Sequence, residues 1–156
     1  MRKIRQHSRR GVVAVEFAIV APILCAIVFG MVKLGRAFEM QNLLDTAARE
    51  GARFASMDRN GMLTGGLTTN QKLSQDVKNF LASNGIPKNK ITVLVKSHTN
   101  PNADFNLDDP TNDLKLFQVR VSVNFSDVSL QSVAAGEDYP LSSKVVFRNG
   151  RATISQ

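Results

Sequence analysis

The stretch RRGVVAVEFAIVAPILCAIVFGMVKLGRAFEMQNLLDTAAREGARFA, residues 9 to 55, decides the fold of this 156-residue chain. It contains a run of 21 residues, from Val12 to Val32, in which Glu16 is the only charged side chain. At 1.5 Å per residue the run predicts a helix of about 31 Å, which is close to the hydrocarbon thickness of a bilayer. The run is therefore long enough and apolar enough to cross a membrane.

Glu16 is the exception within this run. A carboxylate costs a few kcal/mol at the centre of a bilayer and less near the interface, so a charge at this depth needs a partner. If the chain were cut after Gly11, the new α-ammonium of Val12 and the Glu16 carboxylate would lie one helical turn apart, about 6 Å along the axis. The alternative is an uncleaved chain in which Glu16 reaches back to the interface.

Cationic side chains are concentrated before the apolar run. Five of the 20 Lys and Arg residues lie within the first ten positions, where there is no acid. Residues 12–156 carry 15 cationic and 13 acidic side chains, so most of the net charge of +7 belongs to this leader. By the positive-inside rule, the asymmetry predicts an N-in, C-out topology, with most of the chain in the periplasm or outside the cell. Because the excess charge sits in the leader, nucleic acid is not an expected partner.

The run does not read as a removable secretory signal. Such a signal ends at an A-x-A-like site, whereas Ala21 is followed by Pro22 and has Ile19 two positions before it. Cys25 is the only cysteine, which excludes an intrachain disulfide and a thiolate metal site. Lipoprotein processing is also disfavoured, because Leu24 stands where a small residue is required. We therefore expect the segment to be retained.

The stretch also resembles a known family. Arg10-Gly11-Val-Val-Ala-Val-Glu16-Phe17, then Ala18, Pro22, Gly30 and Gly35-Arg36, and finally Ala47-Ala48-Arg49-Glu50-Gly51-Ala52-Arg53 are similar to the TadE family of pilin-like proteins. These proteins belong to the tight-adherence (Flp) pilus systems of bacteria. The resemblance covers residues 9 to about 55 and implies a pilin-like fold, in which the outer half of a long N-terminal helix lies against a small sheet.

The resemblance also implies roles for particular residues. In that family and its type IV pilin relatives, a prepilin peptidase cuts after the glycine, and the glutamate five residues later is associated with subunit docking. Carried over, Gly11 is the cleavage residue, Val12 the new N-terminus and Glu16 the docking carboxylate. Phe17 stands where major Flp pilins usually have Tyr, which favours a minor pilin. Independently of the family, Pro22 is expected to kink the helix.

The rest of the chain predicts an α+β domain with an antiparallel sheet, because helical patterns come first and strand patterns follow. Residues 34–57 continue the first helix with an amphipathic pattern, and the three glycines of residues 58–66 end it, as a stop or a hinge. A second helix is expected after a cap at Thr68 or Thr69, with an apolar stripe of Leu73, Val77, Phe80 and Leu81, and a stop at Gly85 before Pro87.

Three strands are expected beyond this helix. They cover residues 91–96, residues 117–125 with the even positions facing water, and residues 141–148. Asn149-Gly150 is the preferred dipeptide of a tight hairpin, which would return through residues 151–155. The sheet would thus be completed by the C-terminal end of the chain.

A polar segment, residues 98–113, separates the first two strands. Asp104, Asn106, Asp108 and Asp109 resemble the start of a calcium loop, but Asp109 occupies the position of the required Gly, and Lys115 that of the closing Glu. Oxygen-rich turns are usually solvated turns, so these four are only weak metal candidates. As an exposed loop, the segment is a candidate for contact with a partner.

No catalytic constellation is present in the sequence. The only histidines are His7 and His98, and no nucleophile, metal or phosphate-loop pattern can be assembled, so neither an enzyme nor a bound cofactor is expected. The predicted organisation is a basic leader (1–11), a transmembrane assembly helix (12–33), its amphipathic continuation (34–57) and a periplasmic or extracellular α+β domain (58–156).

The predicted function is that of a minor pilin or pseudopilin of the bacterial inner membrane, with incorporation into the extracellular pilus as its second expected location. Its expected partners are other pilins, the prepilin peptidase, the inner-membrane pilus assembly platform and the lipid bilayer. One alternative is an uncleaved, single-pass periplasmic scaffold of the export machinery. Another is a membrane-tethered, calcium-binding adhesin.

Overall fold

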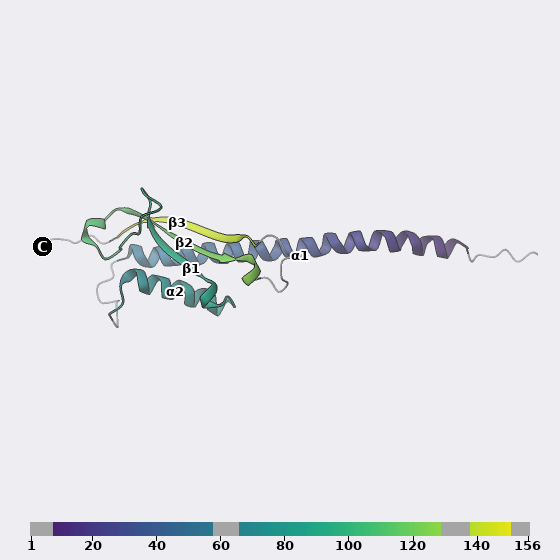
Figure 1. Ribbon diagram of the computed structural model, residues 1–156, viewed down its shortest axis with the longest axis horizontal. Helices are drawn as coiled ribbons and strands as arrows, with labels where there is room; N and C mark the ends of the chain where they lie inside the picture. Colours follow the sequence, from purple (N-terminus) through teal and green to yellow (C-terminus); the bar gives the residue numbers. More distant parts are fainter. Residues whose placement is uncertain (1–7, 58–65, 129–137, 151–156) are drawn as a thin grey trace, which may run out of the picture. The chain divides into compact units, whose positions relative to one another are not determined.

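A computed structural model describes residues 8–57, 66–128 and 138–150, and its architecture is α+β, as predicted (Figure 1). The chain divides into two compact units, Met1–Phe38 and Glu39–Gln156. The helices and strands are α1 (Ser8–Ser56), α2 (Thr69–Ser83), β1 (Thr92–Ser97), β2 (Leu116–Asn124) and β3 (Pro140–Arg148), with short 3₁₀ turns at Lys88–Lys90, Pro110–Asn112 and Phe125–Asp127.

Helix α1 begins earlier than the sequence suggested. We expected a start near Val12, but the helix already includes Ser8 and runs without interruption through Gly11 and Pro22 to Ser56. A glycine costs a helix only about 1 kcal/mol relative to alanine, so Gly11 does not stop it. The boundary between leader and apolar run is therefore one of composition and not of backbone conformation.

Within the second unit, the C-terminal turns of α1 bury a face of mostly small residues in a core shared with α2 and the sheet. The buried residues recur at helical spacing and are Leu44, Ala47, Ala48, Ala52 and Ala55. A Cβ on Gly51 would lie only 2.7 Å from Val77 Cγ2, so the glycine is needed for the close approach of the two helices. Leu34 and Phe38, at the start of the amphipathic pattern predicted over residues 34–57, are instead exposed.

Helix α2 is bounded by the signals that its sequence carries. The Thr68 side chain accepts a hydrogen bond from the Gln71 backbone, and the Gln71 side chain accepts one from the Thr68 N–H, which completes a capping box. At the other end, Gly85 has a φ of +92°, and the N–H of Ile86 donates to the carbonyl of Leu81 at 3.2 Å. This is the Schellman arrangement, which glycine favours because it has no Cβ.

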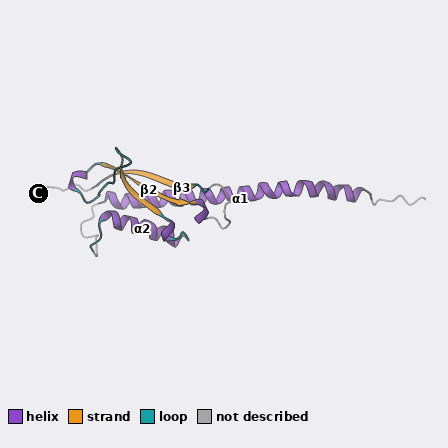
Figure 2. Ribbon diagram, in the orientation of Figure 1, coloured by secondary structure: helices purple, strands orange, loops and turns teal. Residues whose placement is uncertain are grey.

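The three strands, drawn in orange in Figure 2, form an antiparallel sheet, and their order is β1-β2-β3. Val119 at its centre is opposite Val95 on one side and Val145 on the other. The odd positions of β2 point into a core shared with α1 and α2, as the alternation predicted. One prediction was wrong: Gln118, assigned to the wet face, is buried, and its Nε2 has no acceptor among the described residues.

The segment between β1 and β2 is less exposed than its composition suggested. Phe105 and Leu107 enter the core, and the Phe105 ring stacks on Phe117 with centroids 5.6 Å apart. Asn70 of α2 holds the backbone of this segment in place. Its Nδ2 donates to the Phe105 carbonyl at 2.7 Å, and its Oδ1 accepts from the Leu107 N–H at 3.0 Å. The segment is thus partly a core element.

Asn149 and Gly150 close the fold in a way that was not predicted. Asn149 is buried, and its Nδ2 donates to the carbonyls of Leu107 and Asn112 at 3.3 and 3.2 Å. A Cβ on Gly150 would lie 1.7 Å from the backbone oxygen of Ser56. The dipeptide is not assigned as a turn, and the returning strand that we predicted lies outside the described residues.

Candidate functional site

The first candidate site is the N-terminal part of α1. Among the described residues, α1 is the one helix long and apolar enough to cross a membrane, with a mean hydropathy of 2.7 over its most apolar window. None of that window is buried within the protein, and Phe17 is 68 % exposed. Because this surface finds no apolar partner within the described chain, it is available to lipid or to another apolar helix.

The residues predicted for processing and docking, Gly11, Val12 and Glu16, lie together at the start of this segment. Val12 and Glu16 are four positions apart in continuous helix, so they lie on the same face, one turn from each other. A Cβ on Gly11 would meet nothing within 4 Å. Packing within the described chain therefore gives no reason for a glycine there.

Phe17 and Pro22 lie in the same exposed helix. Phe17 follows Glu16 by one residue, so the two side chains point about 100° apart around the helix axis. Helix α1 continues through Pro22, which therefore does not end it. The kink at Pro22 stays a prediction, as do the roles of the other residues in this segment.

The four weak metal candidates, Asp104, Asn106, Asp108 and Asp109, form bonds that stabilise their own loop. Asp104 pairs with Lys96 at 2.7 Å, and the Asn106 Oδ1 accepts from the Asp108 N–H at 3.0 Å. Asp108 in turn accepts hydrogen bonds from the backbone N–H and the hydroxyl of Thr69 at the start of α2. Within the described ranges, no three His, Cys, Asp or Glu side chains are grouped to hold a metal ion.

Asp109 has a separate structural role. Its Oδ1 accepts from the hydroxyl and the N–H of Thr111 at 2.8 and 2.9 Å, capping the 3₁₀ turn that follows. These two hydrogen bonds hold the pKa of the Asp109 carboxyl below its usual value. Each of the four metal candidates thus has a local bonding partner that explains its presence.

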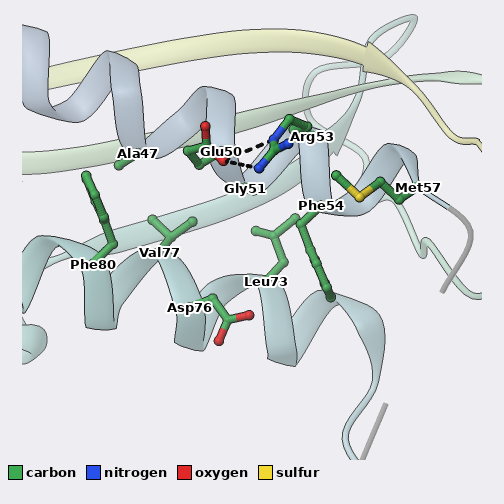
Figure 3. Close-up of a pocket in the computed structure, with 10 residues that line it drawn as sticks. All are labelled: Ala47, Glu50, Gly51, Arg53, Phe54, Met57, Leu73, Asp76, Val77 and Phe80. Atoms are coloured by element: carbon green, nitrogen blue, oxygen red, sulfur yellow. Dashed lines mark hydrogen bonds and ion pairs between the residues drawn. The ribbon is translucent and has the colours of Figure 1, made fainter. Parts of the chain in front are cut away.

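A groove that the sequence did not reveal lies between α1 and α2 (Figure 3). It has a volume of about 470 Å³, with Phe54 and Phe80 among its apolar walls. Glu50 and Arg53 form an ion pair of 3.0 Å at its edge. The full lining is Ala47, Glu50, Gly51, Arg53, Phe54, Met57, Leu73, Asp76, Val77 and Phe80, which offers apolar contact but no nucleophile.

Comparison with known proteins bears on α1 alone. Neither the curated proteins nor the solved structures give a match to this chain. A family model described as TadE-like protein matches residues 11–53, which begin at Gly11 and end in the turns that pack on α2. Residues 11–53 are thus similar to the TadE-like family, as the motifs of this segment indicated.

Proposed function

We propose that this protein is a structural subunit, a minor pilin or pseudopilin, of a tight-adherence type IV pilus system. A prepilin peptidase would cut it after Gly11, and the N-terminal part of α1 would then assemble with other pilins. One observation carries the proposal: the exposed apolar part of α1 lies within the TadE-like match, which begins at Gly11. No enzymatic activity is proposed.

The proposed topology follows from charge. The cationic leader would stay on the cytoplasmic side of the inner membrane, and residues 58–156 would lie in the periplasm or, after assembly, outside the cell. The inner-membrane assembly platform would be the site at which subunits meet. This placement brings each Glu16 to the same depth in the bilayer as the Glu16 of neighbouring subunits.

Glu16 supplies a physical reason for assembly. Exchanging lipid for another apolar helix brings little hydrophobic gain, so close packing and polar pairing decide whether membrane helices associate. A carboxylate in the apolar run is unfavourable by up to about 3 kcal/mol, and pairing with the α-ammonium of a neighbouring Val12 would relieve part of that cost. Assembly would therefore be favoured once cleavage has created the ammonium group.

N-terminal sequencing of the membrane-extracted protein tests the cleavage step. A chain that begins at Val12 supports processing, whereas an intact Met1 refutes it. Deleting the prepilin peptidase is the matched control, because every chain should then retain the leader. The same experiment addresses the second candidate function.

That second candidate is an uncleaved, membrane-anchored scaffold of the export machinery. It is favoured by the continuity of α1 from Ser8 through Gly11, because helical hydrogen bonds occupy backbone groups that a protease would have to contact. Cleavage would therefore require the first turns of α1 to unwind. An intact leader in cells that contain the peptidase would support this scaffold function.

The docking role of Glu16 has its own test. We expect Glu16→Ala to insert into the membrane as well as the wild type, because it removes a charge from lipid, but to be lost from assembled pili. Membrane fractionation and immunodetection of sheared pili measure the two steps separately. Glu39→Ala is the matched control, since Glu39 is an exposed carboxylate on α1 outside the apolar run. Normal incorporation of Glu16→Ala would refute the docking role.

A further inference from the structure

The sheet segregates charge onto one face. Its three strands carry four cationic side chains, Lys96, Arg120, Lys144 and Arg148, and no acidic one. All four occupy even positions, whereas the core residues of the strands occupy odd ones. They therefore share the side of the sheet opposite to the core, which is named the outer face and consists of the even positions of β1, β2 and β3.

The pairing register brings two of these cations together. Arg120 of the central strand lies directly between Leu94 of β1 and Lys144 of β3. Residues directly opposite in an antiparallel pair have Cβ atoms about 5 Å apart, and like charges in that position are destabilising. Within the described residues, Lys96 has an acidic partner, Asp104, while Arg120 and Lys144 form no ion pair.

Protection of the sheet edges explains only part of this pattern. Cations on edge strands discourage unwanted strand pairing, which accounts for Lys96, Lys144 and Arg148. Arg120 lies on the central strand and has no such role, and it adds repulsion with Lys144. Its position points instead to a negatively charged group that comes from outside the described chain.

Apolar side chains lie among the cations of the outer face. Leu94, Leu116 and Val146 are 38 %, 41 % and 37 % exposed. Gln118, in register between Lys96 and Val146, is buried, so the part of this face that a partner can reach consists of the cations and these apolar side chains. The outer face thus combines apolar contact area with an excess of hydrogen-bond donors, as protein interfaces that contain arginine often do.

We propose that the outer face docks an acidic, carboxylate-bearing surface of another protein. Carboxylates would neutralise the Arg120–Lys144 pair, and the planar guanidinium of Arg120 can bind one in a bidentate manner. Leu94, Leu116 and Val146 would supply the apolar contact. This docking requires neither cleavage after Gly11 nor pairing of Glu16, so it is separate from the proposed function.

Two other occupants fit less well. An anionic membrane surface would bind only weakly, because each cation adds little and only Arg120, Lys144 and Arg148 have no ion pair within the described residues. A second copy of this chain would bring no excess of carboxylates, because residues 12–156 carry 15 cationic and 13 acidic side chains, and its loop residues Asp104, Asp108 and Asp109 are engaged by Lys96, Thr69 and Thr111. The acidic surface is therefore expected on a different protein.

Photo-crosslinking of the full chain in cells tests the proposal. A photoreactive phenylalanine analogue at Val146 should give a protein adduct whose crosslinked peptide, sequenced by mass spectrometry, contains more Asp and Glu than Lys and Arg. Adding Arg120→Glu and Lys144→Glu should reduce the adduct at least about tenfold, equivalent to about 1.4 kcal/mol. Lys78→Glu with Lys88→Glu makes the same change in charge outside the sheet and should leave the adduct intact.

A milder variant and salt separate docking from misfolding. Arg120→Gln with Lys144→Gln removes the repulsion between the two cations, so the sheet should remain folded by circular dichroism while the adduct still decreases. Raising the salt from about 50 to about 500 mM should weaken the wild-type adduct, since exposed charges are screened. The proposal is overturned by the absence of an adduct, by an adduct with lipid, nucleic acid, another copy of this chain or a non-acidic peptide, or by insensitivity to these substitutions.

Discussion

At the scale of single residues, Gly51 of the TadE-like segment permits the close approach of α1 and α2. Gly51 faces Val77, and the alanines on either side of it are buried. Gly11, Gly30 and Gly35, in contrast, have open space where a Cβ would be. The same family segment thus contains one glycine required by the packing of this chain and three that this packing does not explain.

Gly51→Ala is expected to lower the free energy of unfolding by about 1 kcal/mol. Overpacking against Val77 costs about 1–3 kcal/mol, and the higher helix propensity of alanine recovers about 1 kcal/mol. In a Val77→Ala background the clash is gone, so the same substitution should be neutral or stabilising. Urea unfolding of the detergent-solubilised chain measures this double-mutant cycle, and an equal loss in both backgrounds would show that the contact is unimportant.

At the scale of secondary-structure elements, α2 is held at both ends by local signals and along its length by the core. The capping box at Thr68 and the Schellman turn at Gly85 fix its limits. Leu73, Val77 and Leu81 are buried, whereas Phe80 of the same predicted stripe is partly exposed in the groove with α1. The element is therefore well specified locally, but its contacts depend on α1.

Thr68→Ala should destabilise the globular part by about 1 kcal/mol, because the backbone N–H of Gln71 loses its acceptor at the start of the helix. Thermal unfolding followed by circular dichroism measures the change. Thr46→Ala is the control: the Thr46 hydroxyl only donates to the Asn42 carbonyl within α1, so its loss should have little effect. Equal losses for the two variants would contradict the capping role.

At the scale of the whole molecule, stability should fall in acid. The carboxyls of Asp109 and Asp138 have pKa values below the usual 3.8, chiefly because the side chains of Thr111 and Ser126 donate hydrogen bonds to them. A lowered folded-state pKa contributes stability above the unfolded value, and this contribution is lost as the pH falls through the folded pKa. Both loops are therefore expected to weaken below about pH 4.

Unfolding by urea at pH 7, 5, 4 and 3 tests this expectation. Asp109→Asn with Asp138→Asn should lose less stability than the wild type between pH 5 and pH 3, because two titrating groups are gone. An identical decline in the two proteins would contradict the role of these carboxyls.

At high pH, Lys90 acts in the opposite sense. Its hydrogen bond to Asp127 raises the pKa of Lys90, so its contribution to stability is lost as the pH rises above about 10.5.

The sequence by itself determined the order and kind of the elements, the exposed apolar part of α1 and its TadE-like match. Helix periodicity, the cap at Thr68, the stop at Gly85 and the alternation in β2 are local signals, so they could be read without knowing the fold. For the same reason, the sequence did not reveal that α1 begins at Ser8 or that Phe38 is exposed. A helical pattern that simply continues shows neither where the helix begins nor which of its turns pack on the core.

Only the tertiary structure decided which polar residues are buried and which surfaces remain free. Asn149 reaches Leu107 and Asn112, and Asn70 reaches Phe105, across separations that no local pattern encodes. Gln118 is buried although it lies between the core residues Phe117 and Val119, at a position where strand alternation predicts exposure. The groove between α1 and α2 and the cationic outer face likewise exist because segments far apart in the chain lie side by side. Burial is a property of the assembled neighbours, so it could not be read from the order of residues alone.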